Sequence, residues 1–212
     1  MALILWDYDG VLVDSMALEE KYYFPACQEA GIEQINTWED IVNLCQGNYY
    51  EECAKVGIEM EKLDTALSIF QKRIDELGCQ IPVVEGMPEI MAHMAQRFPS
   101  YIITSNSATT VAETLKKHNI SGIREILGFE FAKSKVEKIA YVKALFPAEK
   151  TYFIGDTSGD IFEAKSSGVD VTIGVTWGCH TVATLKKAGP DYIFNTVSEL
   201  GKFLSFVERE ER

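Results

Sequence analysis

The chain has 212 residues, of which 47% are hydrophobic and 25% are charged. This length suits one well-buried domain, or a core domain that carries a smaller inserted module. The formal net charge of -12 argues against nucleic acid or an anionic membrane as a partner, because both are bound through basic patches. An anionic substrate would therefore have to be held by local positive charge.

The apolar stretch at the start of the chain is interrupted by Asp7 and Asp9, which makes it too short for a signal peptide or a membrane span. No other segment reaches that length, and we expect a cytoplasmic monomer or homodimer with reduced thiols. The five cysteines contain no CxxC pair, so we interpret them as packing residues without a metal or redox role. They are Cys27, Cys45, Cys53, Cys79 and Cys179.

Four short apolar runs predict buried strands, because each is β-branched or aromatic and ends at polar or turn residues. They cover residues 3–6, 101–104, 151–154 and 171–175. Helical patterns at 88–97, 108–118, 136–145 and 161–167 separate or follow them. Strands that alternate with helices predict an α/β fold with a parallel sheet covered on both faces. Such a sheet binds ligands at the carboxyl ends of its strands.

Residues 15–80 interrupt this alternation with helical periodicity, many Glu and Lys residues, and no convincing strand. Gly31, Gly47 and Gly57 are suitable breaks between helices of this segment. We therefore predict a core formed by residues 1–14 and 81–212, with residues 15–80 as a helical insertion.

Four polar motifs stand close to the ends of predicted strands or helices. Each has a structural alternative, namely a turn, a helix cap or a solvated lysine. The motifs fall at three strand ends of one sheet, however, and this convergence predicts a single functional site. They are Asp7-Tyr8-Asp9-Gly10, Thr104-Ser105-Asn106-Ser107, Lys135, and Gly155-Asp156-Thr157-Ser158-Gly159-Asp160.

The order of these motifs resembles the haloacid dehalogenase-like hydrolase superfamily over about two-thirds of the chain, mainly through the DxDG and GDxxxD pair. The resemblance implies a Rossmann-like three-layer core with a small helical cap at residues 15–80. It also implies that Asp7 is the nucleophile and that Asp9 is the general acid/base.

The remaining motifs acquire roles through the same resemblance. Ser105 and the Asn106 amide would bind the transferred phosphoryl group, and Lys135 would neutralise its charge and orient the nucleophile. Mg²⁺ would be held by Asp7, Asp156 and the Asp9 backbone carbonyl, with Asp160 supporting the metal site. Carboxylate oxygens are the ligands that Mg²⁺ prefers, and a cation is needed before a carboxylate can attack a phosphate.

Two departures from the common family pattern affect these assignments. Val11 stands where Thr is commonest, which removes a hydroxyl but keeps a backbone amide. The lysine motif lacks the frequent Lys-Pro sequence, and Lys133 lies two residues before Lys135. Either lysine therefore remains a candidate for the site.

The insertion resembles the cap of phosphoglycolate phosphatase-like and β-phosphoglucomutase-like branches. Gly47, Asn48, Tyr49 and Tyr50 lie where those branches place a specificity loop, although a plain turn between helices is the alternative. We expect Mg²⁺-dependent hydrolysis of a small phosphorylated metabolite through an aspartyl-phosphate, in the manner of phosphoglycolate phosphatase. A phosphosugar mutase and a non-enzymatic phosphate-binding module are the alternatives.

Overall fold

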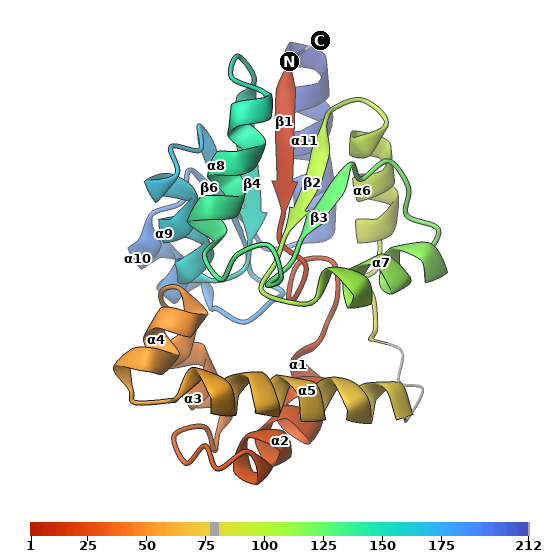
Figure 1. Cartoon of the computed structure of the whole chain (residues 1–212). Coiled ribbons are helices and arrows are strands. Elements are labelled where there is room, and N and C mark those ends of the chain that lie inside the picture. Colours follow the sequence, from red (N-terminus) through yellow and green to blue (C-terminus); the bar gives the residue numbers. More distant parts are fainter. Residues whose placement is uncertain (77–80, 212) are drawn as a thin grey trace.

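The computed structural model describes residues 1–76 and 81–211, which contain a six-stranded sheet of order β3-β2-β1-β4-β5-β6 (Figure 1). Every neighbouring pair is parallel. The chain thus leaves β1 toward one edge and later returns to build the other edge, which creates a topological switch point beside β1. The strands are β1 (Ala2–Trp6), β2 (Ser100–Ile103), β3 (Glu125–Leu127), β4 (Lys150–Gly155), β5 (Val171–Val175) and β6 (Tyr192–Phe194).

The predicted parallel α/β fold is confirmed, and the four apolar runs correspond to β1, β2, β4 and β5. Sequence reasoning missed β3 and β6, which have three residues each and form the two edges of the sheet. Edge strands are partly exposed and need no long apolar run. The missed strands extend the sheet without changing which strand ends lie at its centre.

Helices cover both faces of the sheet, because successive side chains of each strand point to opposite sides. Leu3 and Leu5 of β1 pack in one cluster with α8 and α9, whereas Ile4 and Trp6 pack in the other with α6, α7 and α11. A further helix, α10, packs beside α9. The bounds are α6 (Met87–Ala95), α7 (Ala108–Lys117), α8 (Lys135–Leu145), α9 (Ser158–Ser166), α10 (Val182–Ala188) and α11 (Val197–Glu210).

The inserted helices form a separate layer across the ends toward which the strand arrows point (Figure 1). Buried side chains including Tyr23, Cys27 and Leu63 give this layer an apolar cluster of its own. Residues 77–80, with Cys79, lie outside the described residues, and the boundaries of the cap stay a prediction. The bounds are α1 (Met16–Leu18), η1 (Glu19–Tyr23), α2 (Phe24–Glu29), α3 (Trp38–Leu44), α4 (Tyr49–Lys55) and α5 (Met60–Glu76).

Candidate active site

Three buried carboxylates meet at the ends of the two central strands. Asp7 directly follows β1, and its backbone N–H donates to the Ile154 carbonyl at 2.9 Å, which extends the pairing with β4. Asp156 follows β4, and Asp160 lies in the first turn of α9. Oxygen atoms of Asp7, Asp156 and Asp160 all lie within 4.8 Å of one another. The predicted meeting of these strand ends is therefore observed.

Lys135 supplies the positive charge of this cluster. Its Nζ atom lies 2.9 Å from Asp7 Oδ1 and 2.5 Å from Asp160 Oδ1, and all three side chains are buried. Burial alone would lower the pKa of Lys135, but the charges of Asp160 and Asp7 outweigh it and hold this pKa above its usual range. These ion pairs explain a lysine in the first turn of a helix, where the dipole does not favour it.

Lys133 lies apart from the carboxylate cluster. Its Nζ atom contacts Asp64 Oδ1 of the cap at 3.0 Å and lies 4.5 Å from the centroid of the Tyr50 ring. Its side chain is 42% exposed, whereas that of Lys135 is 7% exposed. Of the two candidate lysines, the structure thus brings Lys135 to the carboxylates.

The carboxylate cluster lacks positive charge even with Lys135 in place. Burial, together with the charge of Asp160, raises the pKa of Asp7 to about 8, although Lys135 opposes this shift. Burial and the neighbouring carboxylates also raise the pKa of Asp156. In Asp160 the effect of burial is outweighed by Lys135, which lowers the pKa. Three ionised carboxylates beside one ammonium leave two excess negative charges, which one divalent cation would balance.

The surroundings of Asp156 also fit a site for a hard cation. A Cβ atom at Gly10 would lie 2.0 Å from Asp156 Oδ2, and one at Gly178 would lie 2.2 Å from the same atom. The Cys179 N–H donates to Asp156 Oδ2 at 2.6 Å. Two glycines thus allow the backbone to approach the Asp156 carboxylate closely, and the Cys179 N–H fixes its position. The oxygens of this carboxylate are suitable Mg²⁺ ligands.

Asp9 lies beside this cluster in a different environment. Asn106 Nδ2 donates to Asp9 Oδ2 at 3.2 Å, and the Ser15 side chain also hydrogen-bonds the Asp9 carboxyl. Burial raises the pKa of Asp9, while these two hydrogen bonds oppose the shift. A carboxyl held outside the charged cluster, with a raised pKa, is suited to carry a proton.

The segment after β2 reaches the same region. Asn106 donates its backbone N–H to Thr104 Oγ1 at 2.9 Å, which shapes the turn, and Ser107 caps α7. Ser105 is half-buried, and its carbonyl accepts a hydrogen bond from the Tyr50 hydroxyl of the cap at 3.1 Å. The segment after β2 is therefore joined to Asp9 through Asn106 and to the cap through Ser105.

The four residues of the expected cap loop differ in what they contact. Asn48 caps α4 and donates to the Lys133 carbonyl at 3.2 Å and to Glu163 Oε1 at 2.9 Å. Tyr50 contacts the Ser105 carbonyl, whereas the Tyr49 hydroxyl lies 2.8 Å from that of Tyr23 within the cap. A Cβ atom at Gly159 of α9 would lie 2.2 Å from the Gly47 carbonyl oxygen. Gly47, Asn48 and Tyr50 thus contact the core, and Tyr49 packs inside the cap.

Sequence reasoning missed His180, which joins the core to the cap. His180 is 1% exposed; its Nδ1 accepts from the Ser158 N–H at 2.9 Å, and its Nε2 lies 2.9 Å from the Val42 carbonyl. Acceptance at Nδ1 makes Nε2 the donor of a neutral imidazole. Its position in the loop after β5 was the available signal, because that loop also starts at the carboxyl edge of the sheet.

Glu19 is a second residue that sequence reasoning missed. Its Oε1 atom accepts a hydrogen bond from Ser15 Oγ at 2.8 Å, at the start of the π-helical turn η1. Burial, followed by the charge of Asp9, raises the pKa of Glu19 to about 8. A π-helical turn often marks a functional position, but the sequence gives no indication of one at this point.

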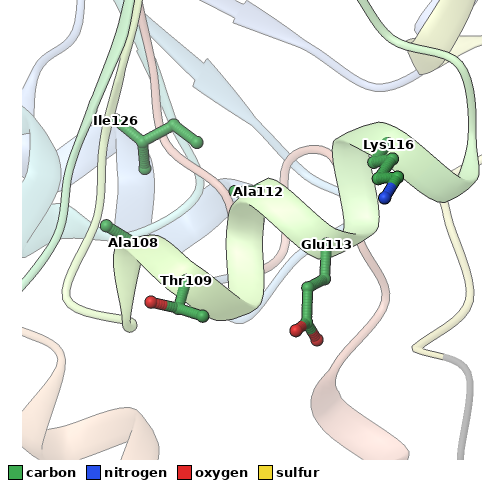
Figure 2. Close-up of a pocket in the computed structure, with 6 residues that line it drawn as sticks. All are labelled: Ala108, Thr109, Ala112, Glu113, Lys116 and Ile126. Atoms are coloured by element: carbon green, nitrogen blue, oxygen red, sulfur yellow. The ribbon is translucent and has the colours of Figure 1, made fainter.

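Figure 2 shows a pocket elsewhere, lined by residues of α7 and by Ile126 of β3. Its lining contains none of Asp7, Asp156, Asp160 and Lys135, so it lies outside the candidate site. The lining residues are Ala108, Thr109, Ala112, Glu113, Lys116 and Ile126.

Carboxylates and a lysine at the carboxyl edge of a parallel sheet define an α/β enzyme that acts on an anionic substrate. The model of the haloacid dehalogenase-like hydrolase family matches residues 4–174, and the chain belongs to that family. The predicted family is thereby confirmed.

Two relatives and one solved structure illustrate the similarity. A phosphoglycolate phosphatase of Synechococcus elongatus is 22% identical, covering 94% of this chain and 95% of its own. Pyrophosphatase PpaX of Bacillus velezensis is 25% identical, covering 93% of each chain. A predicted phosphatase from Clostridium acetobutylicum is 21% identical with a TM-score of 0.78, covering 96% of this chain and 97% of its own.

Membership of this family, together with relatives that are named phosphatases, makes the protein a phosphatase. The two named relatives differ in substrate, so their names leave the leaving group open. Within residues 1–76 and 81–211, no helix is both long and apolar enough to cross a bilayer.

Proposed function

We propose that the protein is a Mg²⁺-dependent phosphatase that hydrolyses a small phosphomonoester through an aspartyl-phosphate on Asp7. One observation carries this proposal: Asp7, Asp156 and Asp160 converge with Lys135 at the two central strand ends. The arrangement places a carboxylate nucleophile beside a fixed ammonium and leaves the charge of a divalent cation to be supplied.

In the first proposed step, a carboxylate oxygen of Asp7 attacks phosphorus while the bond to the leaving oxygen breaks. Asp9 donates its proton to that oxygen, and the alcohol departs. Lys135 orients Asp7 through the 2.9 Å contact. Ser105 and Asn106, in the turn after β2, would bind the oxygens of the phosphoryl group. An aspartyl-phosphate and a deprotonated Asp9 result.

In the second proposed step, Asp9 takes a proton from a water molecule whose oxygen attacks phosphorus. The bond to Asp7 breaks, inorganic phosphate leaves, and both carboxyl groups return to their starting states. Asn106 positions Asp9 for both proton transfers through its 3.2 Å hydrogen bond. One carboxyl thus serves as acid and then as base.

Asp7, Asp156 and the backbone carbonyl of Asp9 would hold Mg²⁺, and Asp160 would support the site through its contact with Lys135. When bound, Mg²⁺ would reduce the repulsion between the nucleophile and the phosphate. The donors are carboxylate and carbonyl oxygens, which this ion prefers.

The proposal is tested by trapping the phosphorylated enzyme. We expect wild-type protein quenched in acid during turnover of a labelled phosphomonoester to carry label that hydroxylamine removes, as an acyl phosphate requires. Asp7→Asn should carry none and lose turnover by at least about 10⁴-fold, because an amide cannot attack phosphorus. The matched control is Asp75→Asn, an exposed carboxyl of α5 that should behave like wild type. Label on Asp7→Asn would reject the proposed nucleophile.

Metal removal tests the second part of the proposal. Exhaustive chelation should abolish phosphate release, and added Mg²⁺ should restore it, because the excess negative charge of the site would otherwise repel the substrate. Full turnover after chelation would reject the metal assignment.

The final acceptor of the phosphoryl group distinguishes a phosphatase from a mutase and from a binding module. A phosphatase releases inorganic phosphate, whereas a mutase would return the group to another hydroxyl of a sugar phosphate. A binding module would show neither the trapped label nor any product.

A further inference from the structure

One buried hydroxyl links Glu19 of the cap to the proposed acid/base, Asp9. Ser15 Oγ donates to Glu19 Oε1 at 2.8 Å, and the same side chain hydrogen-bonds the Asp9 carboxyl. The hydroxyl has a single proton, so both bonds form together only when one of the two carboxyls is protonated and donates to Ser15 Oγ. Ser15 is 4% exposed, so water does not screen this link well. Glu19 therefore lies two hydrogen bonds from the carboxyl that would protonate the leaving oxygen.

The Glu19 carboxyl is also electrostatically coupled to one group of the cap and one of the core. These are Cys45, which follows α3 in the cap, and Cys179, in the core loop after β5. The backbone N–H of Cys179 in turn donates to Asp156. The Glu19 carboxyl thus lies close to groups of the cap and to the core loop that contacts Asp156.

The groups that most affect the pKa of Glu19 include no lysine or arginine; burial and the charge of Asp9 have the largest effects. Lys135 is engaged by Asp7 and Asp160, and Lys133 is paired with Asp64 at 3.0 Å. Residues 15–80 contain 13 acidic and 5 basic residues, so the cap as a whole adds negative charge. An ammonium group beside Glu19 would stabilise its ionised form and lower its raised pKa, so the two groups could pair as opposite charges. A carboxylate on the leaving group would instead favour neutral Glu19 and be disfavoured by the negative charge of the cap.

We propose that Glu19 is a specificity-determining residue that accepts hydrogen bonds from a protonated amine on the leaving alcohol. The substrate class would then be phosphate monoesters of amino alcohols. This inference rests on the proposed function, because it assumes that Asp9 faces the leaving oxygen. It assigns to the cap a charge-selective contact that the core does not provide.

Three phosphomonoesters of nearly equal size test the inference: 2-aminoethyl phosphate, 2-hydroxyethyl phosphate and 2-phosphoglycolate. They differ mainly in whether the leaving group ends in an ammonium, a hydroxyl or a carboxylate. We expect kcat/KM of the wild type to fall in that order, with the amine at least about tenfold above the carboxylate. A contact remote from phosphorus should act mainly on KM.

Glu19→Gln keeps the size of the side chain and an oxygen for Ser15 but removes the charge. This change should bring the amine and carboxylate substrates within about threefold of each other. Glu20→Gln is the matched control, because Glu20 is the exposed neighbour in the same turn and should leave the wild-type order unchanged. The wild-type ranking requires no variant and therefore tests the inference even if Glu19→Gln folds poorly.

p-Nitrophenyl phosphate carries no amine, so its hydrolysis tests the proposed phosphatase function independently of the role of Glu19. If the wild type hydrolyses this ester but prefers phosphoglycolate, or if folded Glu19→Gln keeps the wild-type ranking, the inference is wrong and the proposed function stands. If Mg²⁺-loaded wild type hydrolyses none of the four esters, both are wrong.

Discussion

The core and the cap contribute different kinds of contact to the site. In the core, buried charges are paired directly, as in the contacts of Lys135 with Asp7 and Asp160. Where the cap meets the core, neutral groups such as His180 and Tyr50 donate hydrogen bonds to carbonyl oxygens, and the ion pair between Lys133 and Asp64 is largely exposed. Buried charge pairs tolerate little displacement, whereas single neutral hydrogen bonds are exchanged for water at small net cost. From this comparison we propose that the core fixes the chemistry while the cap closes and opens.

Among the changes that test the different roles of core and cap, Asp9→Asn should lower kcat/KM the most. An amide can neither protonate the leaving oxygen nor activate water, and we expect kcat/KM to fall by about 10²–10⁴-fold. Phosphate release from an alkyl phosphate measures the effect. The fall should be smaller for p-nitrophenyl phosphate, because its leaving group needs less protonation. A loss under tenfold with alkyl phosphates would place the acid/base elsewhere.

Lys135→Ala and Lys133→Ala form the next pair. We expect Lys135→Ala to lower kcat by about 10²–10³-fold, because a fixed positive charge beside the transferred group is lost. It should also lower the free energy of unfolding by about 3–5 kcal/mol, because buried carboxylates lose their partner. Lys133→Ala should change either quantity little, since its pair with Asp64 is largely exposed. Turnover assays and denaturant unfolding provide the measurements, and the reverse ranking would move the role to Lys133.

Gly159→Ala tests the contact between cap and core without touching a charged group. The added Cβ atom would lie 2.2 Å from the Gly47 carbonyl oxygen, so the cap would have to move away. We expect kcat/KM to fall by about tenfold while the unfolding midpoint stays near that of wild type. Gly31→Ala is a spatial control, since a Cβ atom there meets nothing within 4 Å, although its positive φ adds local strain in the cap. Unchanged kinetics in Gly159→Ala would show that closure at this point is dispensable.

Tyr50→Phe should give the smallest effect. It removes one hydrogen bond to the Ser105 carbonyl, worth about 0.5–1.5 kcal/mol, so KM should rise by about 2- to 13-fold. Tyr141→Phe, at an exposed site on α8, is the matched control. Tyr49→Phe should reduce cap stability rather than KM, because its partner Tyr23 lies within the cap. Equal KM values for Tyr50→Phe and wild type would exclude a role for this contact in closure.

The parts of the fold that depend on local pattern could be predicted from the sequence. Short apolar runs identified the four inner strands, and motif order identified the strand ends that meet. The edge strand β6 could not be found in this way, because Tyr192 is exposed and the strand has only three residues. Its existence depends on pairing with β5 rather than on a pattern of its own.

Within the site, the sequence placed Asp7 and Asp156 near each other but could not choose between Lys133 and Lys135. That choice depends on direction: Lys135 begins α8 and points inward, while Lys133 precedes the helix and reaches the cap. Asp160 satisfies its structural interpretation, because it forms a capping box with Thr157, and it also forms an ion pair with Lys135. Its support of a metal site stays a prediction. His180 was missed because its partners are brought together only by tertiary contact.

The segment of the cap that meets the loops after β4 and β5 binds the core through its main chain. Val42, Cys45 and Gln46 all present main-chain carbonyls, which accept from His180, Gly159 and Ser158 respectively. These docking bonds do not depend on which side chains the segment carries. Side chains of this segment can therefore change over evolution while the hydrogen bonds that join the cap to the core are kept.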